Sequence, residues 1–315
     1  MSPLPSDPRS RPARGTGEIL VTGATGLLGR SLCRALGRRK VHHRALVRPS
    51  SNRDLLDGAG AYTWMIEGDL TAPRTLAPAA EGVKAVLHLA GLVRSGDEVA
   101  CRAVHVEGTR ALLGALDEGV RFVVLSSDTV LRKHRGAYAE SKAAMEELVR
   151  ECSGVQAVLL RPPMILGPGS PHLSALERAA RLPVIPVPDG VARRAPVHVD
   201  DVVDAVLAAL NLDDALFTEG ALTIDLPGAD ELPFGEVVQT LAAARGWRVP
   251  PVIDVPAPLS RGAVRMLERL GRTQRAESID RKVRGMRESV LTDSGPAREL
   301  LGWCPRPLVE VLAAS

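Results

Sequence analysis

Short apolar segments rich in branched side chains alternate with segments of helical periodicity from residue 18 onward. Apolar residues recur every three or four positions over Leu27–Leu36, Cys101–Glu118 and Ala137–Cys152, which predicts three helices. The apolar segments predict six strands: EILVT at 18–22, HHRALV at 42–47, AYTWMI at 61–66, AVLHLA at 85–90, RFVVLSS at 121–127 and QAVLLR at 156–161. Strands that alternate with helices are typical of parallel sheets, so we predict an α/β fold with a doubly wound parallel Rossmann sheet.

The pattern changes after Arg161, where seven prolines between positions 162 and 188 predict irregular backbone. Further on, Val197–Leu210 predicts a strand end followed by a helix, and ALTIDL at 221–226 predicts another strand; we expect both to rejoin the sheet. Helical periodicity returns around Gly235–Arg245, Leu259–Leu270 and Gly295–Leu301. We therefore expect a Rossmann dinucleotide-binding domain over 18–165 and 195–228, and a smaller C-terminal substrate-binding lobe over 166–194 and 229–315.

Composition narrows the class of protein. The chain has 315 residues, 45% of them hydrophobic, and its 40 basic and 37 acidic residues are scattered, which argues against a nucleic-acid partner. The four cysteines are far apart and no histidine stands at metal-ligand spacing, so we expect no metal site and a reducing, cytoplasmic location. No apolar run approaches the roughly 20 residues of a membrane span. Residues 1–17, rich in proline and arginine, are expected to form a disordered tail, with organelle targeting as the alternative.

A glycine-rich turn, TGATGLLG, directly follows the first predicted strand and precedes a helix. This order is typical of a dinucleotide-binding turn, in which Gly23 allows the tight turn, Gly26 lets the backbone approach the pyrophosphate and Gly29 lets the helix pack on the strand. The free N–H groups at the helix N-terminus favour the phosphates. An ordinary glycine-rich turn would show the same three glycines, so the interpretation depends on the motifs that follow.

The residues after the second strand bear on the choice of cofactor. An acid commonly stands there to bind the ribose 2′-hydroxyl of NAD, whereas this chain has Arg48, with Arg53 close behind. A guanidinium suits a 2′-phosphate, so we expect NADP(H) in preference to NAD(H); a solvated arginine at a strand end is the alternative. Asp69, in GDL after the third strand, is placed to accept a bond from the adenine amino group or to cap the next helix.

Candidate chemistry comes from Tyr138 and Lys142. The chain has only two tyrosines and five lysines, yet these two stand four residues apart at the start of a predicted helix, on one face. We expect the ammonium to favour the phenolate, so that Tyr138 exchanges a proton with an alcohol or carbonyl, while Lys142 also holds the ribose. Ser127 ends the fifth strand, where ligands of such sheets bind, and its hydroxyl can hydrogen-bond the reacting oxygen; taken alone it would be a turn residue.

Together these motifs resemble the extended short-chain dehydrogenases/reductases, the NAD-dependent epimerase/dehydratase family, over residues 18 to about 311. The matching segments are TGATGLLG, GDL, HLAG at 88–91, VEGT at 106–109, VLSSDTV at 124–130, YAESK at 138–142, RPPMILGPG at 161–169, VHVDD at 197–201 and ELLGWCPRP at 299–307. The LVRP segment, the short gap from Ser127 to Tyr138 and the segment from Arg281 to Pro307 resemble an NADP(H)-binding branch related to an accessory subunit of respiratory complex I. The resemblance implies that the cofactor contacts Gly23, Thr25, Gly26, Leu27, Leu28, Gly29, Arg48, Arg53, Asp69, Leu70, Leu89, Ala90, Gly91, Tyr138, Lys142, Pro162, Pro163 and Ile165.

Two departures from the family bear on mechanism. His105 stands where the extended group has an asparagine that supports a water in its proton relay, and both a relay histidine and a buried packing histidine are open. Sugar-nucleotide dehydratases of the group have Thr-Asp-Glu where this chain has Ser127, Asp128 and Thr129. Asp128 matches their proton donor, but Thr129 lacks the carboxylate that would take the carbon-bound proton, so we do not expect dehydration.

The substrate end of the site is less defined. The family binds nucleotide-sugar diphosphates with arginines of the second lobe, for which residues 193, 194, 281 and 284 are available; solvated charges explain these arginines as well. Met164 and Ile165, at the proline-rich strand exit, would shape the acceptor pocket or simply pack in the core.

We expect an NADP(H)-dependent oxidoreductase that transfers a hydride between nicotinamide and a carbonyl or alcohol, with Ser127, Tyr138 and Lys142 as its catalytic residues. A nucleotide-sugar epimerase would use the same residues without net cofactor turnover. A non-catalytic NADPH-binding structural or assembly protein is the third alternative, against which the intact serine, tyrosine and lysine argue. A homodimer is implied by the resemblance alone.

Overall fold

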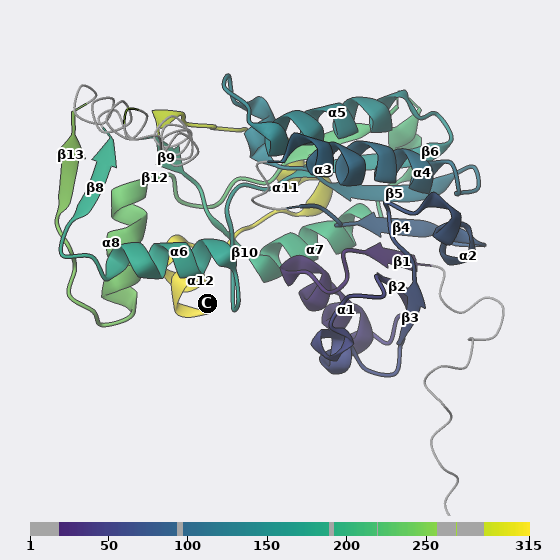
Figure 1. The fold of residues 1–315 in the computed structure, drawn as a ribbon, viewed down its shortest axis with the longest axis horizontal. Coiled ribbons are helices and arrows are strands. Elements are labelled where there is room, and N and C mark those ends of the chain that lie inside the picture. Colours follow the sequence, from purple (N-terminus) through teal and green to yellow (C-terminus); the bar gives the residue numbers. More distant parts are fainter. Residues whose placement is uncertain (1–18, 93–96, 189–191, 219, 257–268, 270–286) are drawn as a thin grey trace, which may run out of the picture.

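The sheet at the centre of the molecule has seven parallel strands, as in a Rossmann fold (Figure 1). The structure is a computed structural model that describes residues 19–92, 97–188, 192–218, 220–256, 269 and 287–315. The strands lie in the order β11-β6-β5-β4-β1-β2-β3. The six predicted strands are all in this sheet, and the predicted fold class is confirmed. The seven strands of the sheet are β1 (Ile19–Thr22), β2 (His43–Val47), β3 (Thr63–Glu67), β4 (Ala85–His88), β5 (Val120–Leu125), β6 (Val155–Arg161) and β11 (Leu222–Asp225).

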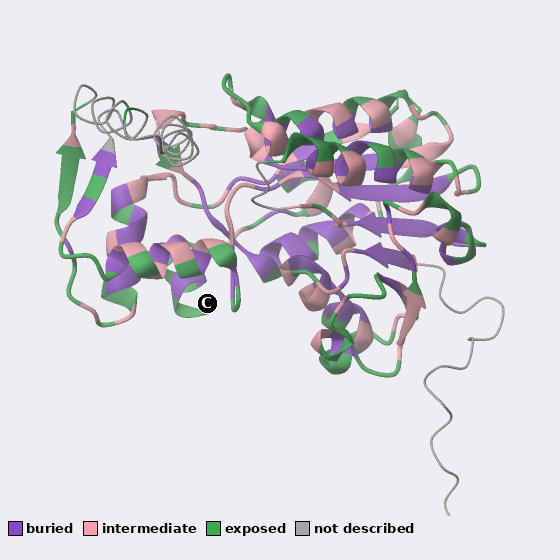
Figure 2. Cartoon of the chain, in the orientation of Figure 1, coloured by how far each residue is buried: buried purple, intermediate pink, exposed green. Residues whose placement is uncertain are grey.

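Helices cover both faces of this sheet, and the central strands β1, β4 and β5 are almost entirely buried, whereas the edge strand β3 is half-buried (Figures 1 and 2). Successive side chains of a strand point to opposite faces, so Val21 packs in the cluster on one face and Leu20 in the cluster on the other. The first face carries α1 (Leu27–Arg38) and α7 (Val199–Ala209). The second carries α2 (Ala77–Ala80), α4 (Gly108–Leu113) and α5 (Ala137–Glu151). Because both faces are covered, these strands are continuous apolar runs rather than alternating ones.

The helix predicted over Cys101–Glu118 begins and ends earlier than expected. It consists of α3 (Glu98–Arg102), a π-helical turn η3 (Ala103–Glu107) and α4, which ends at Leu113. It begins early because the carboxylate of Asp97 accepts a hydrogen bond from the backbone N–H of Ala100, 3.1 Å away, and caps the first turn. The π turn contains His105, whose role is described below.

The region after β6 forms a smaller lobe with its own buried core. The prediction of irregular backbone there is wrong for residues 171–180, which form the ten-residue helix α6 (Pro171–Ala180). A proline fits the first helical position because no backbone N–H is needed there. Helices α6, α8 (Phe234–Ala244) and α12 (Leu308–Ala313) pack together through buried side chains that include Leu176, Leu241 and Val311. The strands of this region are β7 (Ile165–Leu166), β8 (Ile185–Pro188), β9 (Arg193–Arg194), β10 (Val197–His198), β12 (Leu232–Pro233) and β13 (Val252–Val255).

One predicted strand does not rejoin the central sheet. Val197–His198, which is β10, pairs with β7 in a separate two-stranded sheet, whereas β11 joins β6 as expected. Pro162 and Pro163 directly follow β6 and have no N–H to donate, so the ladder ends there and the chain leaves the sheet. The short β7–β10 pair that follows links the two parts of the molecule.

The boundaries of the two predicted domains stay a prediction. Within the segment assigned to the lobe, α11 (Gly295–Leu301) lies over the exact range predicted, but its Ala297, and Trp303 after it, belong to the buried cluster of the sheet. The predicted tail, nearly all of the helix predicted over Leu259–Leu270, and the arginines at 281 and 284 lie outside the described residues. In the described part of the chain, no helix has the length and apolar character to cross a membrane.

Candidate functional site

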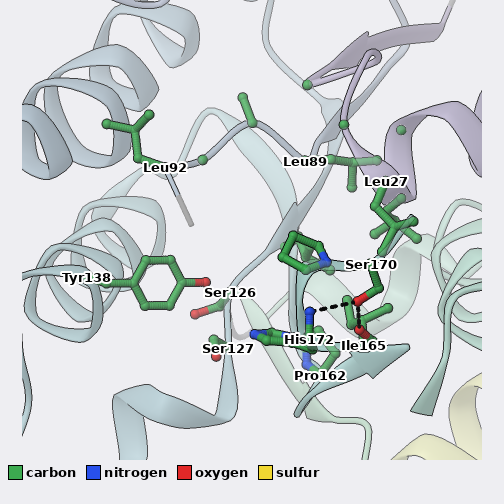
Figure 3. Close-up of a pocket in the computed structure, with 18 of the residues that line it drawn as sticks. Leu27, Leu89, Leu92, Ser126, Ser127, Tyr138, Pro162, Ile165, Ser170 and His172 are labelled. Carbon is green, nitrogen blue, oxygen red and sulfur yellow. Dashed lines mark hydrogen bonds between the residues drawn. The ribbon is translucent and has the colours of Figure 1, made fainter. Parts of the chain in front are cut away.

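A cavity of about 800 Å³ opens at the carboxyl ends of the central strands, between the sheet and the smaller lobe. In a parallel sheet this edge is where the loops converge and where ligands bind. Figure 3 shows residues from several loops facing this space, with Leu27 and Leu89 on one side and Tyr138 on the other. The cavity is therefore a single space shared by the glycine turn and the candidate catalytic residues.

The glycine turn has no room for side chains. Gly23 has a φ of +68°, and a Cβ on it would lie 2.7 Å from the backbone nitrogen of Ala90. A Cβ on Gly29 would lie 2.2 Å from the carbonyl oxygen of Gly23, so the helix could not pack against the turn. Helix α1 begins after Gly26 with no side-chain cap, which leaves its first backbone N–H groups facing the cavity. This cradle fits the pyrophosphate of a dinucleotide.

The arginines predicted to hold a 2′-phosphate differ in position. Arg48 lines the cavity, but Arg53 does not, because its guanidinium forms an ion pair with the carboxylate of Glu67 at the end of β3. The cavity is instead lined by Arg30 and Ser51, which the sequence analysis missed. Arg30 directly follows the last glycine of the turn, and Ser51 closes a turn with the carbonyl of Arg48 at 2.9 Å; these positions were the only signals for them.

Asp69 also lines the cavity, and at the same time it stabilises a turn. Its carboxylate accepts hydrogen bonds from the backbone N–H and the hydroxyl of Thr71, at 2.9 and 2.8 Å. The expected helix cap is not formed, because the next helical turn, Pro73–Thr75, begins after Ala72 with no side-chain cap. The other expectation, a bond to the adenine, stays a prediction.

Ser127 and Tyr138 lie together on the side of the cavity opposite the glycine turn. Figure 3 shows the phenol of Tyr138, from the start of α5, directed toward Ser126 and Ser127. Burial raises the pKa of Tyr138 to about 12, and a hydrogen bond with Ser127 opposes the rise. The expectation that the phenolate is favoured is wrong for this structure, because burial outweighs any stabilisation of the charged form. At neutral pH Tyr138 is an acid that carries its proton.

Ser127 is held by its neighbours in the 3-10 turn η4 (Asp128–Leu131). Its hydroxyl donates to the carboxylate of Asp128 at 3.2 Å and accepts from the hydroxyl of Thr129 at 3.0 Å. Burial raises the pKa of Asp128, while Arg132 and the hydrogen bond from Ser127 lower it. Thr129, which replaces the glutamate of the dehydratases, thus orients the serine hydroxyl.

Lys142 is buried under the cavity and does not line it. Its ammonium donates to the carbonyl oxygen of Leu125 at 2.7 Å and lies beneath Gly91, which does line the cavity. Burial lowers the pKa of Lys142 to about 8, and the charge of Glu146, one helical turn further on, opposes the fall. The pKa of this ammonium is thus close to neutral pH. Gly91, which has no side chain, lies between the ammonium and the cavity.

His105 is buried and forms a hydrogen bond through each of its ring nitrogens. Its Nε2 accepts from the backbone N–H of Leu92 at 3.0 Å, so Nδ1 carries the proton and donates to the hydroxyl of Ser141 at 2.7 Å. Ser141 in turn donates to the carbonyl oxygen of Tyr138 at 3.0 Å, and the His105 ring meets the Tyr138 ring edge-on at 5.5 Å between centroids. Burial, with the charge of Lys142, lowers the pKa of His105 to about 3, so the ring is neutral. Nδ1 thus helps to hold Tyr138 through Ser141, whereas Nε2 holds the backbone at Leu92.

All but two of the predicted cofactor and catalytic residues line the cavity, the exceptions being Arg53 and Lys142. Met164, Arg193 and Arg194 line it as well, from the smaller lobe. Their roles toward ligands stay predictions. Lining residues that the sequence analysis missed also include Leu92, Arg132, Ser170, His172 and Val290.

Comparison with known proteins gives a consistent family. The model of the NAD dependent epimerase/dehydratase family matches residues 19–224, which is the central sheet with its helices. The chain is 36% identical over 198 residues to ceramide reductase of Caulobacter vibrioides, a match that covers 61% of this chain and 60% of that protein. It is 29% identical over 330 residues to 2-alkyl-3-oxoalkanoate reductase of Stenotrophomonas maltophilia, covering 93% of this chain and 96% of that protein.

Solved structures extend the likeness of fold over almost the whole chain. UDP-glucose 4-epimerase of Brucella ovis, solved in complex with NAD, superimposes with a TM-score of 0.70 over 94% of this chain and 97% of that one. The two sequences are 20% identical, so this likeness concerns the fold.

Proposed function

The chain belongs to the NAD-dependent epimerase/dehydratase family, whose members bind a nicotinamide cofactor, and we propose that it is an NADP(H)-dependent oxidoreductase acting on a carbonyl or alcohol. The observation that carries the proposal is the placement of the Ser127 and Tyr138 hydroxyls in the same cavity as the glycine turn. The relatives named ceramide reductase and 2-alkyl-3-oxoalkanoate reductase favour carbonyl reduction.

The residues divide the work of reduction. In the proposed reaction the Ser127 hydroxyl turns from Asp128 to donate to the oxygen of the substrate carbonyl, which polarises it. Tyr138 gives that oxygen its phenolic proton as the C=O bond becomes a C–OH. The glycine turn would hold NADPH, which when bound would supply a hydride to the carbonyl carbon. Lys142, whose ammonium lies beneath Gly91, stabilises through its charge the phenolate that remains on Tyr138. Because burial raises the pKa of Tyr138 to about 12, the proton needed for reduction is in place at neutral pH.

The preference for NADP(H) rests on charge near the end of β2. Arg48 lines the cavity directly after β2, where Ser51 adds a hydroxyl, and Arg30 of α1 lines the same cavity. The guanidinium groups suit the dianionic 2′-phosphate that distinguishes NADP from NAD. Arg53 has no part in this proposal, since Glu67 is its partner.

Direct assay of the purified chain tests the proposal. A panel of ketones, aldehydes and UDP-sugars is incubated with NADPH and with NADH, and both the cofactor absorbance and the products are followed. We expect NADPH consumption with at least one carbonyl compound. Ser127→Ala should lower kcat on that substrate about 30-fold, which corresponds to a loss of about 2 kcal/mol of transition-state stabilisation.

The same assay distinguishes the alternatives. A UDP-sugar converted to its epimer without consumption of NADPH would replace the oxidoreductase by an epimerase. NADPH binding with no conversion of any compound would favour the structural or assembly role. In either case the proposed reduction is refuted.

A further inference from the structure

We propose that the substrate carries a carboxylate group, held near the reacting carbonyl by Arg132. This inference deepens the proposed function and rests on it. Arg132 follows the turn η4 that begins at Ser127, and it lines the cavity together with Asp128 and Arg194. The sequence analysis did not select it, since nothing in the motifs marks it.

The guanidinium of Arg132 lacks a partner. Its Nε is buried and has no hydrogen bond, and within the described part of the chain its side chain forms no ion pair. Its backbone N–H, by contrast, closes the turn on the carbonyl of Thr129 at 3.2 Å, so the residue is fixed in place. A buried guanidinium N–H without an acceptor is costly, and an anion that enters the cavity would satisfy it.

The nearby acids form no hydrogen bond with this guanidinium in the described part of the chain. The Asp128 carboxylate accepts from the hydroxyl of Ser127 and interacts with Arg132 only through its charge. Glu288 accepts through its carboxylate from the backbone N–H groups of Lys133 and His134. Both acids therefore have other partners.

A second guanidinium adds to the positive charge. Arg194 donates to the carbonyl oxygen of Glu288 at 2.8 Å, and its pKa is lowered by burial and by the charge of Arg132. Arg132 and Arg194 therefore lie within electrostatic reach of Asp128 and Glu288, and in the described part of the chain the Nε–H of Arg132 is left without an acceptor. One free N–H on a cation that has acids nearby suits a carboxylate monoanion better than a phosphate dianion.

Apolar side chains also line the cavity, among them Leu92, Met164 and Val290, together with the polar His172. An oxo-carboxylate with a hydrocarbon chain would place its ketone against Ser127 and Tyr138, its carboxylate at Arg132 and its chain on these side chains.

Matched pairs of substrates test the inference. Decanoates with a ketone at carbon 3, 4, 5 or 6, and the methyl ester of each, are assayed with NADPH on the wild type, Arg132→Met and Arg135→Met. Arg135 is exposed, lies three residues further on and does not line the cavity, so it is the matched control. We expect the best acid to exceed its ester in kcat/KM, and Arg132→Met to lower the value for the acid about 10- to 100-fold while changing the ester less than about threefold. Equal losses on acid and ester, or no preference for acids in the wild type, would overturn the carboxylate site and leave the proposed reductase standing.

A binding measurement covers the case in which no compound is reduced. Decanoate and methyl decanoate are titrated by calorimetry into wild type and Arg132→Met, each saturated with NADP⁺. Decanoate binding that is lost in Arg132→Met supports the carboxylate site even though the proposed function has failed. Equal binding by both proteins, or none by the wild type, overturns it.

Discussion

Replacing Glu146 by glutamine tests the link between the buried charges of this fold and its chemistry. The Glu146 side chain is 2% exposed and accepts from Arg161 through both of its oxygens, with Nε at 2.8 Å and a terminal nitrogen at 2.5 Å. Arg150 donates to it at 2.6 Å from the next turn of α5. Glu146 is also one turn from Lys142 and raises the pKa of that lysine. The substitution removes one negative charge and keeps the shape of the side chain.

The expected effect on stability follows from the burial of the partners. Breaking a buried ion pair from one side costs about 3–5 kcal/mol, and we expect about 3 kcal/mol here because glutamine still accepts a hydrogen bond. The effect should depend on pH in a defined sense. Arg161 and its neighbours lower the pKa of Glu146 below the unfolded value, so its contribution is complete above that value and is lost as the pH falls through the native pKa.

The effect on catalysis has a separate readout. The pKa of Lys142 is about 8, and the loss of the Glu146 charge should lower it further. The basic limb of the kcat/KM profile should then begin at lower pH in Glu146→Gln than in the wild type, since that profile reports the free enzyme. Urea unfolding measures the stability, and Glu147→Gln is the control, because Glu147 is the exposed neighbour on the same helix. A basic limb at the same pH in all three proteins would refute the coupling of Glu146 to Lys142.

Further predictions concern the cofactor site and the buried histidines. Gly29→Ala should abolish NADPH binding in a fluorescence titration, because its Cβ would lie 2.2 Å from a carbonyl oxygen; retained affinity would contradict the role of the turn. Arg48→Ala should weaken NADPH by about 1.5–3 kcal/mol relative to NADH, whereas Arg53→Ala should leave the ratio unchanged; equal weakening of both cofactors would exclude Arg48 from the 2′-phosphate site. Burial holds the pKa of His88 and of His105 at about 3, below the 6.5 of the unfolded chain, so only the unfolded state takes up these protons between pH 6.5 and 3. The free energy of unfolding should fall by about 2 kcal/mol for each histidine from pH 7 to pH 5 in urea titrations, and a constant value would contradict their burial as neutral rings.

Regular local patterns made most of the Rossmann part predictable. The central strands are buried on both faces, so each one is a short apolar run, and the glycine pattern that ends in Gly29 marked the start of the first helix. The smaller lobe was harder to predict, because a proline that ends one element can begin the next. Pro171 opens α6 in a region where prolines had indicated irregular backbone.

The same limit applies to the candidate site. Tyr138, Ser127 and the glycine turn have recognisable neighbours in the sequence, and they lie around one cavity. The partners of charged side chains have no such signal: Glu67 takes Arg53 away from the cavity, and Arg132 enters it unpaired. The pKa of Tyr138 could not be inferred from its spacing to Lys142, because the burial that raises the pKa depends on how the whole molecule packs around the cavity.

Isotope transfer with a tyrosine variant tests the central claim most directly. NADPH deuterated at C4 of the nicotinamide is incubated with the best carbonyl substrate and the wild type, Tyr138→Phe or Tyr62→Phe, where Tyr62, at the other end of β3 from the cavity, packs on His42 and is the only other tyrosine. We predict one deuterium at the carbinol carbon with the wild type and Tyr62→Phe, and a rate lowered at least about 100-fold with Tyr138→Phe despite retained NADPH binding. Deuterium transfer by Tyr138→Phe at the wild-type rate would contradict the assignment of Tyr138 as the proton donor.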